Sequence, residues 1–151
     1  MKNNLNTPMS NDIMSLSAIY DKENMHLAIQ SFSEQIKKSK EIIKNHTFSI
    51  QGNINNVIIC GMGGSAIGGD FCKSLLGSEI NINIYVNRGY SLPAWASDNS
   101  LIIISSYSGN TEETISCYKE CISKSFNPVI ISTGGFILNS AKENNNMYIE
   151  V

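Results

Sequence analysis

The clearest structural signal in the chain is the run Val57-Ile58-Ile59-Cys60-Gly61-Met62-Gly63-Gly64-Ser65. Its first four residues form a short, continuous apolar segment, which is typical of a strand buried on both faces. A glycine-rich turn follows at once, and a helical pattern then extends to Leu76. We therefore expect a strand, a tight turn and a helix whose N-terminus faces the space beyond the strand.

Strands and helices alternate over the rest of the chain. Apolar runs predict four further strands, at 80–86, 101–104, 129–132 and 147–151, and helical patterns cover 111–125 and 135–144. Such alternation indicates βαβ units with right-handed crossovers, hence an α/β fold with a doubly wound parallel sheet. Before the first strand, residues 12–45 have a helical pattern, with Asp21 as the N-cap of the longer helix. We divide the chain into an N-terminal tail with helices, 1–45, and an α/β domain, 46–151.

The composition argues against several classes of protein. The 151 residues suit one domain, and the net charge of −2 with no dense Lys or Arg segment argues against binding nucleic acid or a membrane surface. No run of about 18 apolar residues predicts a membrane span. The cysteines at 60, 72, 117 and 121 form no metal-binding pattern with the two histidines, His26 and His46. We expect reduced thiols in a cytoplasmic protein without a metal or an organic cofactor.

Two turns have the composition of an anion site. The first is Gly61–Ser65, and the second, after the third predicted strand, is Ser105-Ser106-Tyr107-Ser108-Gly109-Asn110-Thr111. Glycine backbone, hydroxyl groups and helix N-termini all bind phosphate without requiring a positive side chain. Either turn alone is also compatible with an ordinary tight turn or a capping loop. Because both follow adjacent strands, we expect them to meet in one crevice at the carboxyl edge of the sheet.

A dinucleotide is the alternative ligand. Gly61, Gly63 and Ala66 fit the G-x-G-x-x-G/A pattern that follows a strand in such sites. A dinucleotide site also needs an acidic residue at the end of the second strand, to hold the ribose hydroxyls. That strand ends in Tyr-Val-Asn followed by Arg88, so we favour a simple phosphate ester.

At this point the chain resembles the sugar isomerase (SIS) family, and most closely its bifunctional phosphoglucose/phosphomannose isomerase branch. The resemblance covers residues 21–151. It rests on the two turns with their flanks, 61–70 and 106–114, and is supported by Arg88-Gly89-Tyr90-Ser91-Leu92-Pro93 and by the helical segment 24–35.

The resemblance implies a flavodoxin-like, five-stranded sheet of order 2-1-3-4-5. It also implies a hexose 6-phosphate substrate: glucose 6-phosphate or mannose 6-phosphate interconverted with fructose 6-phosphate. Arg88 and Tyr107 are further candidates for the crevice, although an ion pair is the alternative role for Arg88. The residues implied to surround the phosphate are Gly63, Gly64, Ser65, Ser106, Ser108 and Thr111.

The family reaction is proton transfer between C1 and C2 through a cis-enediol, using a Glu, a His, a Lys and an Arg. The resemblance places all four beyond Val151, so it implies no catalytic residue within this chain. We therefore expect the N-terminal half of a two-domain, homodimeric isomerase, with negligible activity of its own. The alternatives are a sugar-phosphate-sensing SIS module without catalysis and a single-domain SIS isomerase that acts as an oligomer.

Overall fold

The structure, a computed structural model, describes residues 16, 19–44, 46 and 52–151. The beginning of the expected N-terminal tail, residues 1–15, lies outside the described residues. The chain divides into two compact units, Met1–Lys44 and Asn45–Val151. In the described part of the chain, no helix is long and apolar enough to cross a membrane.

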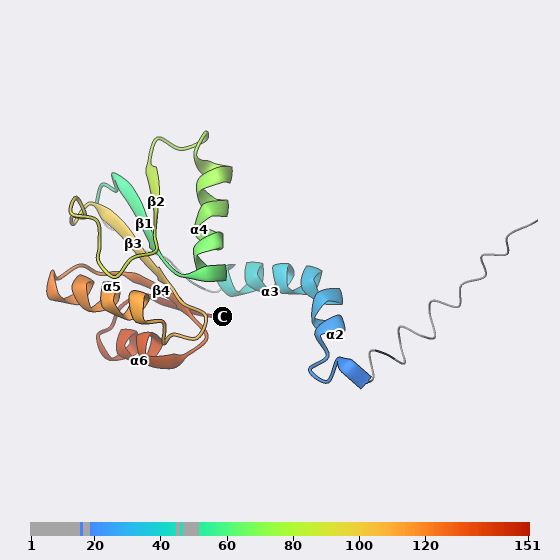
Figure 1. Cartoon of the computed structure of the whole chain (residues 1–151). Coiled ribbons are helices and arrows are strands. Elements are labelled where there is room, and N and C mark those ends of the chain that lie inside the picture. The colour runs from blue at the N-terminus through green and yellow to red at the C-terminus, as the bar shows by residue number, and fades with distance from the viewer. Residues whose placement is uncertain (1–15, 17–18, 45, 47–51) are drawn as a thin grey trace, which may run out of the picture. The chain divides into compact units, whose positions relative to one another are not determined.

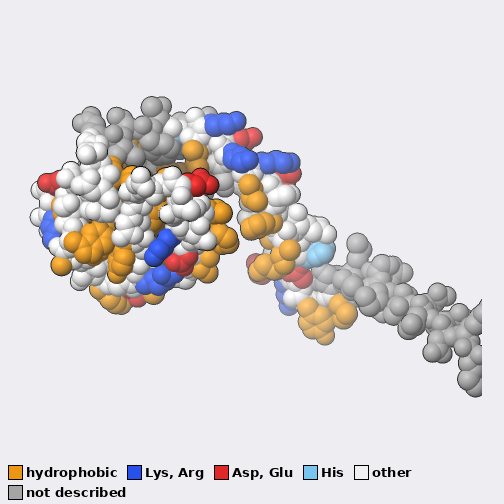
Figure 2. Space-filling view, turned by 90° about the horizontal axis from the view of Figure 1, so that it is seen from above, with side chains coloured by type: hydrophobic (Ala, Val, Ile, Leu, Met, Phe, Trp, Pro, Cys, Tyr) orange, Lys and Arg blue, Asp and Glu red, His pale blue; other side chains and the backbone are white. Residues whose placement is uncertain are grey.

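The described residues of the first unit include the helices α2 (Met25–Gln30) and α3 (Phe32–Lys44). The N-cap residue of α2 is Asn24, and not Asp21 as we expected, because the helix begins three residues later than the sequence suggests. The carboxylate of Asp21 still accepts hydrogen bonds from the first N–H groups of α2, 2.6 Å to Met25 N and 2.8 Å to His26 N. The continuous longer helix that we expected is interrupted at Ser31, whose hydroxyl donates to the carbonyl of Ala28. Lys and hydrophobic side chains occupy different sides of α3 (Figure 2).

The second unit is built on a five-stranded parallel sheet, which confirms the predicted fold. The strand order is β2-β1-β3-β4-β5, and all four pairings are parallel. The strands are β1 (Asn56–Cys60), β2 (Asn83–Asn87), β3 (Ser100–Ser105), β4 (Val129–Ser132) and β5 (Tyr148–Glu150).

Helices cover both faces of this sheet (Figure 1). On one face α4 (Gly63–Leu76) packs on β1 and β2, where Gly69 lies directly against Ile59 and Val86. On the other face α5 (Glu112–Ser123) packs on β3, and α6 (Gly135–Glu143) packs on β4 and β5. The main core lies beneath α5 and α6, because alternate residues of each strand face that side. It includes Ile58, Cys60, Ile102, Ile104, Ile130, Cys117, Cys121 and Ile137.

The register aligns the ends of the three strands that matter for function. Cys60, the last residue of β1, pairs with Asn87 of β2 and with Ile104 of β3. The turns that follow β1 and β3 therefore leave the same edge of the sheet, from neighbouring strands. The described crossover from β2 to β3, residues 88–99, contains no helix, so this part of the edge is formed by a loop.

Candidate functional site

The first turn joins β1 to α4 and lies against the end of β3. The N–H of Gly61 donates to the carbonyl of Asn87 at 3.1 Å. A β-carbon on Gly61 would lie 3.1 Å from Ala66 N and 3.2 Å from the carbonyl oxygen of Ser105, so a larger residue would push the two turns apart. The next glycine in the turn, Gly63, has a φ of +52°, which a residue with a side chain adopts only at a cost.

The second turn joins β3 to α5, and its hydroxyls divide into two groups. Ser106 is buried: its Oγ lies 3.1 Å from Thr111 Oγ1 and accepts the N–H of Gly109 at 3.1 Å. Ser108 is exposed, and its Oγ accepts the N–H of Asn110 at 3.2 Å. The hydroxyl of Ser106 thus shapes the turn, and the hydroxyl of Ser108 is open to solvent.

Both turns present free backbone donors. Among the described residues, no group accepts a hydrogen bond from the N–H of Gly63, Gly64 or Ser108. The first N–H groups of α4 and α5 point out of their helices in the same way, as helix N-termini require. Unpaired N–H groups with a helix dipole behind them favour a negatively charged ligand.

A third turn supports the second one, and the sequence reasoning did not assign it to the site. It joins β4 to α6 and consists of Thr133, Gly134 and Gly135. A β-carbon on Gly135 would lie 2.3 Å from the carbonyl oxygen of Ser108. The side-chain oxygen of Asn110 accepts the N–H of Phe136 in the first turn of α6, at 2.9 Å. The paired glycines that follow the fourth predicted strand after Thr133 are the sequence signal for this contact.

The structure places the two crevice candidates differently. Arg88 follows β2 and forms an ion pair with Asp70 of α4, in which both side chains are about half exposed. Tyr107 lies in the second turn with 75% of its surface exposed. Arg88 therefore has the ion pair that was its alternative role, while the ring of Tyr107 is free to contact a ligand.

The acidic residues at the start of α5 face another tyrosine. The hydroxyl of Tyr90, in the β2–β3 crossover, donates to Glu112 Oε2 at 3.4 Å. The negative charges of Glu113 and Glu112, together with some desolvation, raise the pKa of Tyr90 above its usual value, and Glu113 has the largest effect. The phenol therefore stays protonated at neutral pH and remains a hydrogen-bond donor.

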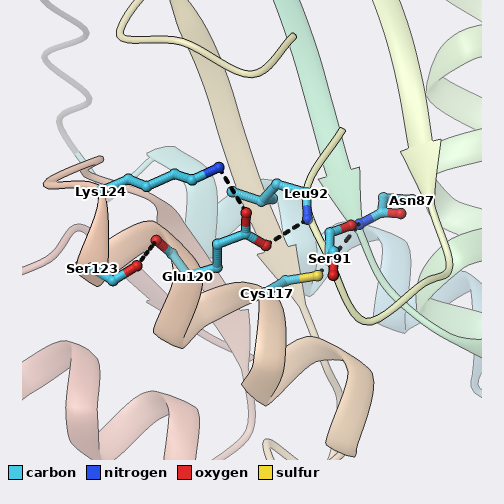
Figure 3. A network of polar contacts seen from close by, with 7 residues as sticks. All are labelled: Asn87, Ser91, Leu92, Cys117, Glu120, Ser123 and Lys124. Carbon is cyan, nitrogen blue, oxygen red and sulfur yellow. Dashed lines mark hydrogen bonds and ion pairs between the residues drawn. The ribbon is translucent and has the colours of Figure 1, made fainter. Parts of the chain in front are cut away.

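Polar contacts with α5 fix the crossover that carries Tyr90 (Figure 3). Glu120 accepts the N–H of Leu92 at 2.8 Å and pairs with Lys124 at 2.7 Å. Asn87 donates to the carbonyl of Ser91 at 3.0 Å and to the Sγ of Cys117 at 3.3 Å. The hydrogen bond from Lys124, then the one from Leu92, lowers the pKa of the Glu120 carboxyl.

Three of the four cysteines are buried in the core. All four are free thiols, and only Cys72 is exposed. Burial, followed by the negative charges near it, raises the pKa of Cys121 to about 12. The pKa of Cys117 is raised as well, first by its hydrogen bond with Cys60. Within the described ranges, no group of three or more His, Cys, Asp or Glu side chains could hold a metal ion.

A hollow of about 460 Å³ lies at the opposite edge of the sheet. It is lined by residues at the amino ends of β3 and β4, among them Ser100, Leu101 and Val129. In open parallel sheets, ligands bind beyond the carboxyl ends of the strands. The free donors of the two turns lie at that carboxyl edge, so we place the candidate site there and not in the hollow.

Comparison with known proteins bears on the family of the chain and on its fold. No family model matches the chain. A bifunctional phosphoglucose/phosphomannose isomerase from Caldicellulosiruptor bescii is 42% identical over 112 residues, which are 74% of this chain and 33% of that protein. The chain belongs to this isomerase family. A second bifunctional phosphoglucose/phosphomannose isomerase, from Aquifex aeolicus, is 34% identical over 80% of this chain and 36% of its own length.

The chain thus spans about a third of the length of the family members that it matches. Solved structures share its fold at low sequence identity. A Clostridium difficile 630 protein provisionally assigned as a phosphosugar isomerase aligns with a TM-score of 0.54 at 17% identity, over 78% of this chain and 33% of its own. The NanR protein of Vibrio vulnificus, solved with ManNAc-6P, aligns with a TM-score of 0.51 at 15% identity, over 84% of this chain and 52% of its own.

Proposed function

We propose that residues 46–151 form the sugar-phosphate-binding SIS domain of an isomerase that interconverts glucose 6-phosphate or mannose 6-phosphate with fructose 6-phosphate. The observation that carries this proposal is the pair of turns that leave β1 and β3 side by side, with free N–H groups at Gly63, Gly64 and Ser108. Membership of the phosphoglucose/phosphomannose isomerase family supports the choice of substrate.

In this proposal the phosphate is held by neutral donors. Gly63 and Gly64 supply backbone N–H groups, and Ser65 and Ser108 supply hydroxyls. The hydroxyls of Ser106 and Thr111 lie 3.1 Å apart and stabilise the second turn on its inner side. Tyr107 and Arg88 line the rim, Tyr107 with its exposed ring and Arg88 as one partner of the ion pair with Asp70.

Proton transfer requires groups outside these two turns. Neither turn, 61–65 or 105–111, contains an Asp, Glu, His or Lys. The family reaction needs a base to move a proton between C1 and C2 of the sugar, and such catalysis contributes about 10² to 10⁴ in rate. We infer that a second SIS domain supplies the Glu, His and Lys, and that the Arg follows shortly after the strand that ends near Val151. This chain then binds and orients the phosphate end of the substrate.

The remaining parts of the proposal concern the organisation of the protein. Residues 1–45 are an N-terminal tail with helices that precedes the SIS domain. We propose that the isomerase is a homodimer located in the cytoplasm, which agrees with four free thiols, since disulfides are rare in that compartment.

The test is thermal unfolding of the 151-residue chain with fructose 6-phosphate. A ligand at 100 times its Kd stabilises a folded protein by about 2.7 kcal/mol, so the melting temperature should rise. The double variant Ser106→Ala/Ser108→Ala should lose that rise, and Ser123→Ala, which removes an exposed hydroxyl of α5, should keep it. A folded wild-type chain that melts at the same temperature with and without the sugar phosphate would contradict the proposal.

A sensing module is the second candidate function. The absence of Asp, Glu, His and Lys from both turns favours it, because binding needs no proton-transfer group. A sensing module predicts sugar-phosphate binding by a protein whose full natural length shows no isomerase activity. An assay of fructose 6-phosphate formation with that full-length protein distinguishes the two functions.

A further inference from the structure

The second turn depends on a residue that lies outside both phosphate-binding turns. We propose that Thr133, directly after β4, is a positioning residue that aims the backbone N–H of Ser108 at the bound phosphoryl group. This inference rests on the proposed function, because it concerns the same site.

Thr133 makes two hydrogen bonds to one carbonyl. Its backbone N–H donates to the carbonyl oxygen of Tyr107 at 3.2 Å, and its hydroxyl donates to the same oxygen at 2.7 Å. A carbonyl oxygen has two lone pairs, so two donors saturate its capacity to accept hydrogen bonds. The orientation of the peptide between Tyr107 and Ser108 is therefore fixed from the β4 side.

Because the peptide group is planar, the two hydrogen bonds to the carbonyl of Tyr107 also set the direction of the N–H of Ser108. The peptide bond is trans, so the carbonyl of Tyr107 and the N–H of Ser108 point in opposite directions in one plane. The carbonyl points towards β4, and β4 and β1 lie on opposite sides of β3. The N–H of Ser108 consequently points towards the β1 side, where the turn at residues 61–65 lies.

Side-chain packing does not hold this peptide in place. Tyr107 is 75% exposed, and Ser108 is exposed as well. The N–H of Ser108 makes no hydrogen bond to a described residue, so it is available to a ligand. The two bonds from Thr133 are thus the specific restraint on the one peptide that offers this donor, and the hydroxyl provides the shorter of them.

The experiment follows the amide signal of Ser108 by NMR in the 151-residue chain, during titration with fructose 6-phosphate and with inorganic phosphate. In the wild type, this amide proton should move downfield as the ligand binds. Thr133→Val removes only the hydroxyl bond, and we expect about tenfold weaker binding, or ~1.4 kcal/mol, with a smaller shift of the Ser108 signal. Thr133→Ser keeps the hydroxyl and should restore both values.

A matched control is Ser123→Ala, which also removes a hydroxyl bond to a backbone carbonyl, that of Glu120 at 2.8 Å, in the last turn of α5. Its Kd and its Ser108 shift should equal those of the wild type. All Kd values are measured at a temperature where circular dichroism shows each variant folded. Thr133→Ala provides the same comparison if the valine variant does not fold.

Two outcomes would overturn the inference, and they are distinguishable. If the wild type binds sugar phosphate and the Thr133 variants bind it equally well with the same Ser108 shift, Thr133 does not position the donor, while the proposed function stands. If the folded wild type binds neither ligand, the proposed function fails and the role of Thr133 fails with it.

Discussion

The carbonyl oxygen of Gly134 lies 1.8 Å from the position that a β-carbon on Gly109 would occupy. Gly109 also has a φ of +67°, in the region that residues with side chains avoid. The turn after β3 and the turn after β4 therefore pack main chain against main chain, and Gly109 cannot accept a side chain at this contact.

Gly109→Ala should consequently be strongly destabilising. The left-handed conformation alone costs about 1–2 kcal/mol for alanine, and the clash with Gly134 adds to it, so we expect a loss of at least ~2 kcal/mol. Gly68→Ala is the control, because a β-carbon there would meet nothing within 4 Å. In the interior of α4 that change should be neutral or stabilise by up to ~1 kcal/mol. Urea unfolding of both variants measures the contrast, and equal stabilities would contradict the packing.

Glu120 should make the free energy of unfolding of the second unit depend on pH in the acidic range. Its folded-state pKa is lowered, by the hydrogen bond from Lys124 first and by that from Leu92 second. A group with a lowered pKa contributes stability above its unfolded pKa, near 4.3 for Glu. That contribution disappears as the pH falls through the folded value.

Glu120→Gln removes this titration while keeping the shape of the side chain. The wild type should therefore lose more stability than the variant between pH 6 and pH 3, as measured by urea unfolding at each pH. Glu79→Gln is a comparison at an exposed carboxylate beyond the end of α4. The prediction is wrong if Glu120→Gln and Glu79→Gln change the pH profile by the same amount.

One cysteine should react rapidly in the folded chain. Cys72 is exposed on α4, and Cys60, Cys117 and Cys121 are buried. Because the thiolate is the reactive form, a pKa of about 12 leaves Cys121 almost entirely protonated at pH 8. A disulfide reagent such as 5,5′-dithiobis(2-nitrobenzoate) should label one thiol quickly in native protein, four in denaturant, and none quickly in native Cys72→Ser. Fast labelling of a second native thiol would show that the core beneath α5 is open.

The sequence predicted the sheet well, because its strands are continuous apolar runs. The second strand was placed at 80–86, three residues too early at its start. Its residues before Asn83 are apolar enough, but Asn83 pairs with Asn56, the first residue of β1, so earlier residues have no partner strand. The apolar pattern of one strand carries no information about the length of the strand that it pairs with.

The two turns of the candidate site were also found from the sequence, because glycines and hydroxyls directly after strands are local signals. The support that the second turn receives from Thr133, Gly134 and Gly135 was not found. It depends on contacts between residues about 26 positions apart, such as Asn110 with Phe136. Likewise, the burial of Ser106 and the exposure of Ser108 are set by tertiary packing, and the two residues look equivalent in the sequence.

The close fit of Gly109 against Gly134, and of Gly135 against Ser108, has a mechanical consequence. The two turns have no space to slide past each other, so they move as one rigid body. The binding site would then already have its bound conformation in the free protein, so the protein would lose little conformational entropy when a ligand binds. Changes of ligand preference among relatives with this interlock would then come from side chains at the rim, since the path of the main chain is not free to vary.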